Sequence, residues 1–220
     1  MPGRKGTSHK PDEGSALSRE RELVQLATSG DQRAIGSLYD IYVAPLYRFC
    51  LSKLSNETDA EDLTEEIFLK AITSIDKFTW RDSKQKRDDE AGEFNPFRAW
   101  LFRIARNQII STYRKRDTRS RVDVHYEDAP VWIADKTPGP EEITERKFLL
   151  EQAAAAIEQL PESQRDVIQL RFMGDMSVSE VANLLGKEPG NVRVLQHKAL
   201  KNLRTILAGE FDLLEVESQR

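Results

Sequence analysis

The chain of 220 residues has a single cysteine, Cys50, and only three histidines, which lie far apart at positions 9, 125 and 197. One cysteine excludes an intrachain disulfide and any zinc site built from cysteines, and isolated histidines give no metal-ligand spacing. The sequence also lacks a recognisable nucleophile with its base and a glycine-rich phosphate loop. We therefore predict no catalytic residue, no metal site and no cofactor, so that an enzyme is the least supported class of function.

Long apolar runs are missing as well. No run reaches the roughly 18 residues that a membrane-spanning helix needs, and residues 1–18 are polar, without the apolar centre of a signal peptide. The sequence thus predicts a cytoplasmic protein that does not insert into a membrane. The same residues are rich in Gly, Pro, Ser and charge, which favours a disordered N-terminal tail.

Strand signals are also lacking, because no segment of weight alternates apolar and polar residues in the manner of a β-strand. Apolar residues recur instead at helical spacing, and this pattern lapses after Arg116 through a stretch with prolines at 130, 138 and 140. The sequence predicts an all-α fold in which two small helical domains are joined by a flexible linker. The predicted parts are a disordered N-terminal tail at 1–18, a first domain at 19–117, the linker at 118–139, a second domain at 140–208 and a C-terminal tail at 209–220.

Local signals divide the first domain into helices. Gly30 is predicted to end one helix and Asp31 to cap the next. Thr58 and Glu61 have the spacing of a capping box, which predicts the start of a third helix. The segment from Thr79 to Phe94 has no periodicity, and a loop of this length usually has a function or is disordered. A fourth helix is expected after it.

The formal net charge of −4 is distributed unevenly. Six acids and no base lie between Glu57 and Glu66, whereas the segment from Asn95 to Arg116 carries six bases and no acid. Blocks of opposite sign suggest two different partners, one basic and one polyanionic.

The basic segment is predicted to be a helix that starts at the N-cap Asn95, with Pro96 in its first turn. Helical spacing puts Phe97, Leu101, Ile104 and Gln108 on one face, with Trp100 at its border, and Arg103, Arg106, Asn107, Ile110 and Arg114 on the other. The second face suits a nucleic-acid backbone and unstacked bases. A solvated helix with a basic outer face is the alternative. For Phe97 and Trp100, core packing is favoured over base stacking.

The stretch from Ser177 to Arg204 has the layout of a helix-turn-helix. Ser177 and Glu180 form a second capping box, Gly186 suits the positive φ of the turn, and Pro189 begins a longer helix. A helical hairpin that packs in a bundle without touching DNA is the alternative, but caps, spacing and charge together favour DNA binding. The side chains placed to meet base edges and phosphates are Lys187, Asn191, Arg193, Val194, His197, Lys198 and Lys201.

Three motifs in order resemble the sigma-70 family of bacterial RNA polymerase sigma factors, in its extracytoplasmic-function group. DAEDLTEEIF at Asp59–Phe68 is similar to the family's region 2.2, which binds the clamp helices of the polymerase β′ subunit. FRAWLFRIARN at Phe97–Asn107 is similar to the region 2.3 to 2.4 helix, which melts and reads the minus-ten element. LPESQRDVIQLRF at Leu160–Phe172, with the helix-turn-helix, is similar to region 4, which reads the minus-thirty-five element and touches the β flap.

The resemblance implies roles for named residues and partners. Core polymerase would be bound by Asp59, Glu61, Asp62 and Glu65, and the minus-ten element by Arg103, Arg106, Asn107, Arg114 and Arg116. The minus-thirty-five element would be bound by the helix-turn-helix residues given above. Promoter DNA is then a partner both as duplex and as single strand, and an anti-sigma factor is a possible further partner that no residue identifies.

The chain departs from the family at three places. Glu65 stands where the family usually has glutamine, Ser111 where it often has aspartate, and the Thr79–Phe94 loop is longer than usual. Because that loop helps to choose the minus-ten sequence in the family, the preferred bases are left open. The role of Val131–Ile133 in the linker is also open.

A stand-alone transcriptional regulator, binding a duplex operator through Asn191–Arg204 without polymerase, is the alternative function. It accounts for the second domain but gives the acidic block and the basic helix no partner.

Overall fold

The computed structural model of the protein describes residues 13–81, 92–119, 149–150 and 152–218, with side chains placed for 16–81, 92–115, 149–150 and 152–208. All regular structure in these ranges is helical, which confirms the all-α prediction. None of the described helices is both long enough and apolar enough to cross a membrane. Most of the Thr79–Phe94 loop and most of the linker, with Val131–Ile133, fall outside the described residues.

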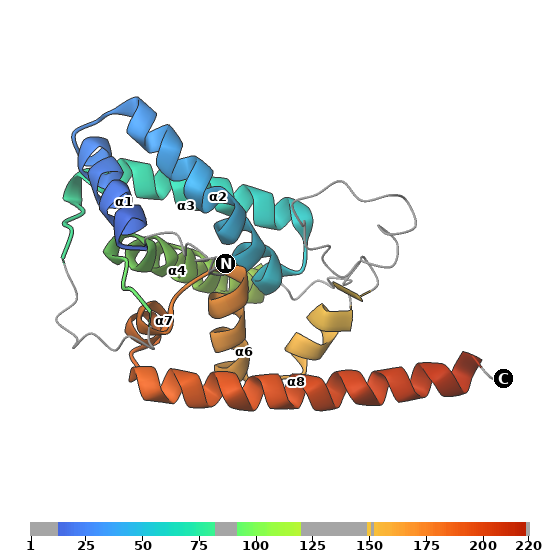
Figure 1. Cartoon of the computed structure of the whole chain (residues 1–220). Helices are drawn as coiled ribbons and strands as arrows, with labels where there is room; N and C mark the ends of the chain where they lie inside the picture. Colours follow the sequence, from blue (N-terminus) through green and yellow to red (C-terminus); the bar gives the residue numbers. More distant parts are fainter. Residues whose placement is uncertain (1–12, 82–91, 120–148, 151, 219–220) are drawn as a thin grey trace, which may run out of the picture.

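The first unit consists of α1 (Glu13–Thr28), α2 (Gln32–Leu54), α3 (Glu57–Ser74), the short 3₁₀ helix η1 (Ile75–Lys77) and α4 (Pro96–Arg119). Helices α1 to α3 lie together above α4 in the view of Figure 1. Asp31 caps α2 as predicted, because its Oδ1 accepts hydrogen bonds from the backbone N–H groups of Arg33 and Ala34. Gly30, at φ +89°, makes the turn between α1 and α2.

Two predicted boundaries in this unit are wrong. Helix α3 is capped by Asn56, whose Oδ1 accepts from Asp59 N at 2.9 Å, and Thr58 already lies inside the helix. Asn56 caps the helix because its backbone is extended, as an N-cap residue requires, whereas the backbone of Thr58 is helical. Helix α1 begins at Glu13, inside the predicted tail 1–18, because the Ala and Leu of this short stretch continue the helix that follows.

The second unit contains a helical stretch at 152–158, α6 (Glu162–Ile168), the π-helical turn η3 (Gln169–Met173), α7 (Val178–Leu185) and α8 (Pro189–Ser218). Helix α8 starts at Pro189 as predicted, but it continues to Ser218, so the predicted C-terminal tail at 209–220 is wrong as far as 218. No proline follows Gly209, and the Glu, Leu and Phe residues there permit the helix to continue.

The two units are not separate bodies in the described structure. Helix α7 packs on α4, and η3 packs on α2, so that α6 and α7 lie between α4 and the long helix α8 (Figure 1). One continuous apolar core includes Phe49 of α2, Phe102 of α4, Leu170 of η3 and Val181 of α7, all almost completely buried. A smaller second cluster joins α6 to α8 and contains Ile157, Leu160, Ile168 and Ala199. The sequence predicted two domains on a linker, and it gave no sign that they share a core.

Gly174, which follows η3, makes this close packing possible. A Cβ atom at this position would lie 2.7 Å from Cε1 of Phe102 and 2.9 Å from the carbonyl oxygen of Leu170. Its φ of −85° is ordinary, so the requirement for glycine is one of space and not of backbone conformation. The turn after η3 thus rests directly on the Phe102 ring of α4.

Candidate nucleic-acid and protein interfaces

The acidic surface lies on the outer face of α3. Glu61, Asp62 and Glu65 are exposed and Asp59 is half-buried, while the opposite face of the helix is buried. Tyr47 lies on the neighbouring helix α2, and its pKa is raised. Partial burial is the main cause, and the negative charges of Glu57 and Glu61 add to it. The exposure of Glu61, Asp62 and Glu65 confirms that these acids lie on the outer face of the helix, as predicted. Such a surface is suited to a basic partner.

The basic helix α4 begins as predicted. Asn95 Oδ1 accepts hydrogen bonds from Phe97 N at 2.9 Å and Arg98 N at 3.0 Å, which caps the helix. Phe97 is buried with its ring against Tyr42 and Phe78, so core packing of this residue is confirmed. Trp100 is half-buried against the Phe78 ring.

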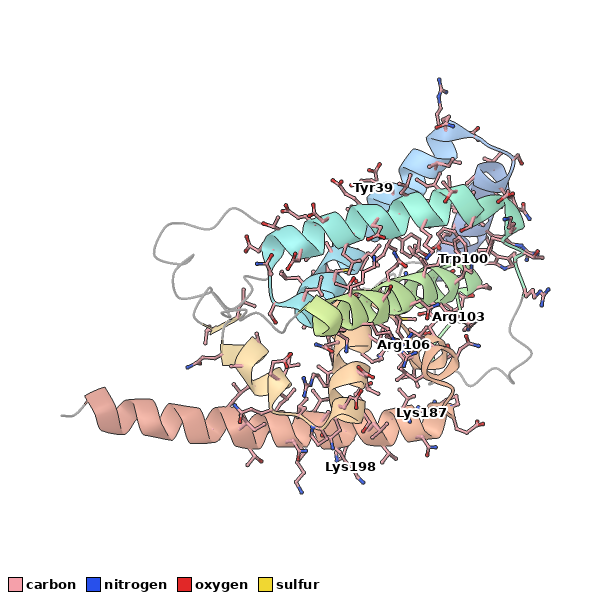
Figure 2. The ribbon with its side chains drawn as sticks, turned by 180° about the vertical axis from the view of Figure 1, so that it is seen from behind. Tyr39, Trp100, Arg103, Arg106, Lys187 and Lys198 are labelled. Atoms are coloured by element: carbon pink, nitrogen blue, oxygen red, sulfur yellow. The ribbon has the colours of Figure 1, made fainter. Side chains whose placement is uncertain are left out.

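On the other side of α4, Arg103, Arg106, Asn107 and Arg114 have exposed side chains. The side chain of Arg116 is not among those that the structure describes. In Figure 2, Arg103 and Arg106 lie on the side of α4 that is turned toward the second unit. The helix has a third face that the two-face prediction missed, because Phe102, Ala105 and Ile109 are buried as well.

Trp80, at the start of the loop, is engaged in packing. Its ring lies edge-on to Phe78, with centroids 6.4 Å apart, and the guanidinium of Arg21 lies 5.8 Å from its centroid. In this structure the ring belongs to the aromatic cluster beside α1.

The helix-turn-helix has the predicted local geometry. Ser177 Oγ accepts from Glu180 N at 3.2 Å and Glu180 Oε2 accepts from Ser177 N at 2.6 Å, which completes the capping box of α7. Gly186 ends α7 in the left-handed conformation, at φ +64°. Helix α8 buries Val192 and Ala199 against the rest of the unit.

The opposite face of α8 is open. Lys198 points away from the rest of the molecule in Figure 2, and Lys187 lies at the turn before the helix. Of the residues predicted to meet DNA, two are half-buried, Lys187 and Arg193, and five are exposed, Asn191, Val194, His197, Lys198 and Lys201. Six of these residues thus lie on α8, and Lys187 lies in the turn that precedes it.

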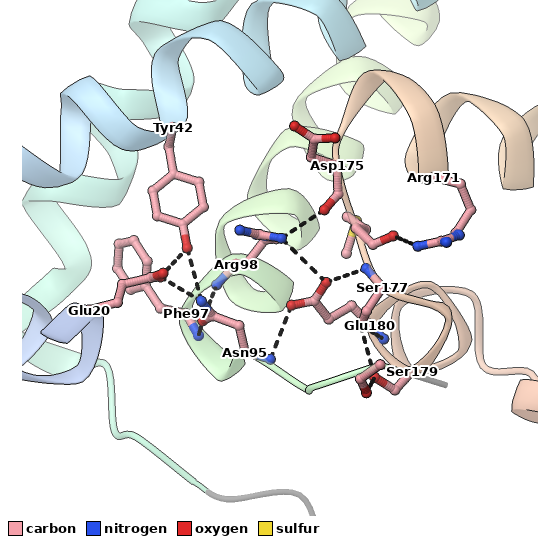
Figure 3. Close-up of polar contacts among 12 residues, drawn as sticks. Glu20, Tyr42, Asn95, Phe97, Arg98, Arg171, Asp175, Ser177, Ser179 and Glu180 are labelled. Atoms are coloured by element: carbon pink, nitrogen blue, oxygen red, sulfur yellow. Dashed lines mark hydrogen bonds and ion pairs between the residues drawn. The ribbon is translucent and has the colours of Figure 1, made fainter. Parts of the chain in front are cut away.

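A buried polar network joins α1, α2, α4 and α7, and the sequence did not reveal it (Figure 3). Asn95 Nδ2 donates to Glu20 Oε1 at 2.6 Å and lies 3.1 Å from the hydroxyl of Tyr42, which itself donates to Glu20. The backbone N–H of Asn95 donates to Glu180 Oε1 at 3.0 Å, and Arg98 Nη1 lies 3.9 Å from Glu180 Oε2. Sequence reasoning gave Glu180 and Asn95 only capping roles, because a cap requires only local partners.

Burial changes the acid–base properties of this network. It raises the pKa of the Glu180 carboxyl, although the charge of Arg98 and the N–H donors of Ser177 and Asn95 act in the opposite direction. It also raises the pKa of Tyr42 well above its usual range, and Glu20 adds to this effect. A carboxyl that is 1% exposed and bound by two N–H groups is a costly group to bury, so its partners matter to the packing of α7 on α4.

No group of three or more His, Cys, Asp or Glu side chains that could hold a metal ion occurs within the described part of the chain. The arrangement consists of three surfaces, one acidic and two basic, on a helical scaffold.

Two family models match the chain, "Sigma-70 region 2" over residues 38–86 and "Sigma-70, region 4" over residues 156–205. The chain is 31% identical over 199 residues to the ECF RNA polymerase sigma factor BldN of Streptomyces coelicolor. The aligned residues cover 90% of this chain and 69% of BldN. It is 28% identical over 194 residues to the ECF RNA polymerase sigma factor SigW of Bacillus subtilis, which covers 84% of this chain and 94% of SigW.

The fold of the chain is also similar to that of solved structures. The structure of CnrH in complex with the cytosolic domain of CnrY matches with a TM-score of 0.56 at 26% identity, over 86% of this chain and 97% of CnrH. The sigma factor RpoE of Bartonella quintana, solved with the anti-sigma factor NepR, matches with a TM-score of 0.57 at 23% identity, over 79% of this chain and 96% of that one. The second likeness shows the fold alone.

Proposed function

The chain belongs to the extracytoplasmic-function RNA polymerase sigma factors, and from this premise we propose how its three surfaces divide the work of a sigma factor between them. A factor of this family binds core RNA polymerase and directs promoter recognition, DNA melting and transcription initiation. The alternative of a stand-alone regulator leaves the match to region 2 unexplained.

The acidic face of α3 is the proposed contact with the β′ clamp helices of core polymerase. Glu61, Asp62 and Glu65 are accessible there, and Asp59 lies at its edge. Complementary charge of this kind mainly sets orientation and encounter rate. Because Glu65 stands where the family usually has glutamine, this chain's surface is more acidic by one charge.

Helix α4 is the proposed contact with the minus-ten element. The arginines 103, 106, 114 and 116 would hold phosphates, and Asn107, on the same side of the helix, would meet a base. An amide can pair with a base edge in two hydrogen bonds, whereas arginines along a helix follow the backbone of the strand. The loop before α4 is proposed to help choose the accepted bases.

The second unit is the proposed contact with the minus-thirty-five element. Asn191, Val194 and His197 lie in the first turns of α8, where a recognition helix meets base edges in the major groove. Lys198 and Lys201 follow and would neutralise phosphates. The family resemblance adds the β flap as a further contact of this unit.

The protein is proposed to act without chemistry of its own, in the cytoplasm, where core polymerase performs the catalysis. An anti-sigma factor is a proposed further partner, because CnrH and RpoE were both solved with proteins bound to them.

The observation that carries this proposal is the placement of the acidic and basic surfaces on separate elements, α3, α4 and α8, in the order of the family's regions. Run-off transcription with core polymerase on genomic fragments, with start sites mapped, tests it. We expect initiation at a set of related promoters that core polymerase alone does not use. Tight, specific binding of the free protein to a promoter duplex, unaltered by core polymerase and without transcripts, would favour the stand-alone regulator instead.

A further inference from the structure

Helix α8 continues well beyond the part of the chain that matches region 4. The match ends at residue 205, whereas the helix runs from Pro189 to Ser218. Residues 206–218 add about 20 Å of helix, at a rise of 1.5 Å per residue. In Figure 1 the last turns of α8 project past the other described helices. This extension is therefore not used by the proposed contacts with DNA and polymerase.

An apolar stripe runs along one side of α8 and into the extension. It is separate from the side that packs on the rest of the unit, where Val192 and Ala199 are buried. Helical spacing places the stripe residues within about 80° of one another around the axis. Leu200 is 45% exposed and Leu207 is half-buried, so the stripe is open to solvent in its described part. The stripe residues are Leu200, Leu203, Leu207, Phe211 and Leu214.

The charge of α8 changes sign along its length. Residues 189–208 contain four bases and no acid, and residues 209–218 contain four acids and no base. Two such helices packed in parallel would place like charges together, whereas an antiparallel pair places each basic half against an acidic half. The charge pattern is thus complementary to an antiparallel copy of the same helix.

The stripe has the symmetry that an antiparallel pair requires. With a two-fold axis at Leu207, Leu200 of one chain faces Leu214 of the other, and Leu203 faces Phe211 of the other. Leu207 then faces Leu207 of the second chain across the axis. Every stripe residue therefore meets an apolar residue, as in an isologous interface, where one surface is its own complement.

The same register brings opposite charges together. Helical spacing puts Lys201, Arg204, Asp212 and Glu215 on one flank of the stripe. Across the axis at Leu207, Arg204 lies about 3 Å along the helix from Asp212 of the second chain, which is less than one turn. Lys201 has the same offset from Glu215 of the second chain. Apolar and charged residues thus agree on one arrangement.

We propose that the stripe of α8 is the interface of a homodimer, in which the α8 helices of two chains pack antiparallel about Leu207. The contact spans about 20 Å of each helix, so a reversible, concentration-dependent dimer is expected. Lys198 lies about 180° around the helix from Leu207, so the proposed DNA-binding face stays open in the dimer (Figure 2). This inference goes beyond the proposed function and needs neither polymerase nor DNA.

The mass of the full-length chain over a range of concentrations gives the first test, by light scattering or sedimentation equilibrium. Leu207→Glu places two carboxylates against each other on the two-fold axis and should abolish the dimer. Thr205→Glu adds the same charge at an exposed position about 160° around the helix and is the matched control. The mass of the parent and of the control should rise from 25.2 kDa toward twice that value, and Leu207→Glu should stay at the monomer mass.

Charge reversal gives the second test and does not alter the apolar stripe. Arg204→Asp and Asp212→Arg should each weaken the dimer about tenfold or more, because each change sets like charges together at two symmetric places. An equimolar mixture of the two variants should dimerise like the parent, since each chain then supplies the charge that the other lacks. In a parallel pair the parent would already have like charges in contact, and the single reversals would not weaken it.

Four results would overturn the inference. They are a parent that stays monomeric at every concentration, a Leu207→Glu variant that dimerises like the parent, single charge reversals without effect, and a mixture that does not recover. A monomeric parent would mean that another segment or another protein covers the stripe. Run-off transcription with core polymerase tests the proposed function separately, since a monomeric sigma factor can still direct initiation.

Discussion

Lys53 Nζ lies 2.6 Å from Asp166 Oδ1, and this ion pair connects the last turn of α2 with α6 across 113 residues of sequence. Both side chains are largely buried, at 18% and 25% exposure, so the pair is screened less by water than a surface pair. It belongs to the contact between the two units, together with the hydrogen bond from Gln169 Nε2 to the carbonyl oxygen of Ser52.

The first prediction concerns this pair. In a double-mutant cycle with Lys53→Met and Asp166→Asn, we expect a coupling of about 1 kcal/mol in the free energy of unfolding, the upper end for pairs that retain some exposure. Denaturant unfolding of the four chains measures it. Glu158→Gln breaks an ion pair with Arg165 inside the second unit and should leave the coupling between Lys53 and Asp166 unchanged. A coupling near zero would mean that the pair does not stabilise the contact.

Reversing the acidic face should separate polymerase binding from folding. With Glu61→Lys and Asp62→Lys together, we expect loss of binding to core polymerase, because a basic partner would then meet two like charges. Both side chains are exposed, so the change in unfolding free energy should stay within about 0.5 kcal/mol for each. Co-migration with core polymerase and a thermal melt are the two measurements. Unchanged affinity for core would refute the assignment of this surface.

Asn107→Ala should alter which downstream bases are accepted. The amide is exposed on the side of α4 opposite to Leu101, so its removal costs one base contact, worth about 1 to 3 kcal/mol of discrimination, and leaves packing intact. Selection from a library randomised in the minus-ten element, with permanganate footprinting of the melted region, measures the effect. Ser111→Ala, on the same helix and half-buried, serves as the control. An unaltered preference would remove Asn107 from the proposed site.

Lys198→Ala should weaken promoter binding by the same factor for all upstream sequences. Its side chain projects from α8 into solvent, where it can neutralise a phosphate (Figure 2). Loss of one phosphate contact lowers the slope of log affinity against log salt by about 0.9. Holoenzyme binding to a promoter fragment over a range of salt concentrations measures that slope. If the variant instead changed the preferred upstream bases, Lys198 would be a base-reading residue.

Acidification should stabilise the packing of α7 on α4 through Glu180. Burial raises the pKa of Glu180 in the folded structure above its ordinary value of 4.5, so the folded chain binds the proton more tightly than the unfolded chain, in which Glu180 is in water. The resulting stabilisation is complete below pH 4.5 and is lost as the pH rises through the raised pKa. The charged groups around Glu180 are Arg98 of α4, Glu20 of α1, and Arg171 and Asp175 of the second unit.

The difference in unfolding free energy between the parent and Glu180→Gln, followed from neutral to acid pH, measures this effect. The folded form should gain at most about 1.4 kcal/mol per pH unit from one proton. Glu180→Gln cannot titrate and should lose most of the pH dependence. The same pH response in that variant would assign the proton to another group.

The sequence by itself determined the helical class, most helix ends and the surfaces on which the charged residues lie. Asp31, Asn95, Ser177 and Gly186 act as predicted because caps and turns need only partners within a few residues. Asn56 was missed for a related reason: two capping signals lie two residues apart, and only the folded backbone decides between them. The start of α1 and the end of α8 were misplaced because Gly14 and Gly209 lie inside these helices, so a glycine near a boundary did not mark it.

Only the tertiary structure decided how the two units pack. The bond from Asn95 N to Glu180 joins residues 85 positions apart, and no periodicity relates them. Its formation depends on the fit of the turn at Gly174 to the ring of Phe102, which allows α7 to approach α4 closely. Such a fit exists only when the two surfaces are assembled. The buried carboxyl of Glu180 depends on assembly in the same way, because it is stable there only when its hydrogen-bond donors are in place. The sequence therefore specified the surfaces of this sigma factor, and the packing of its two units decided which of them are covered.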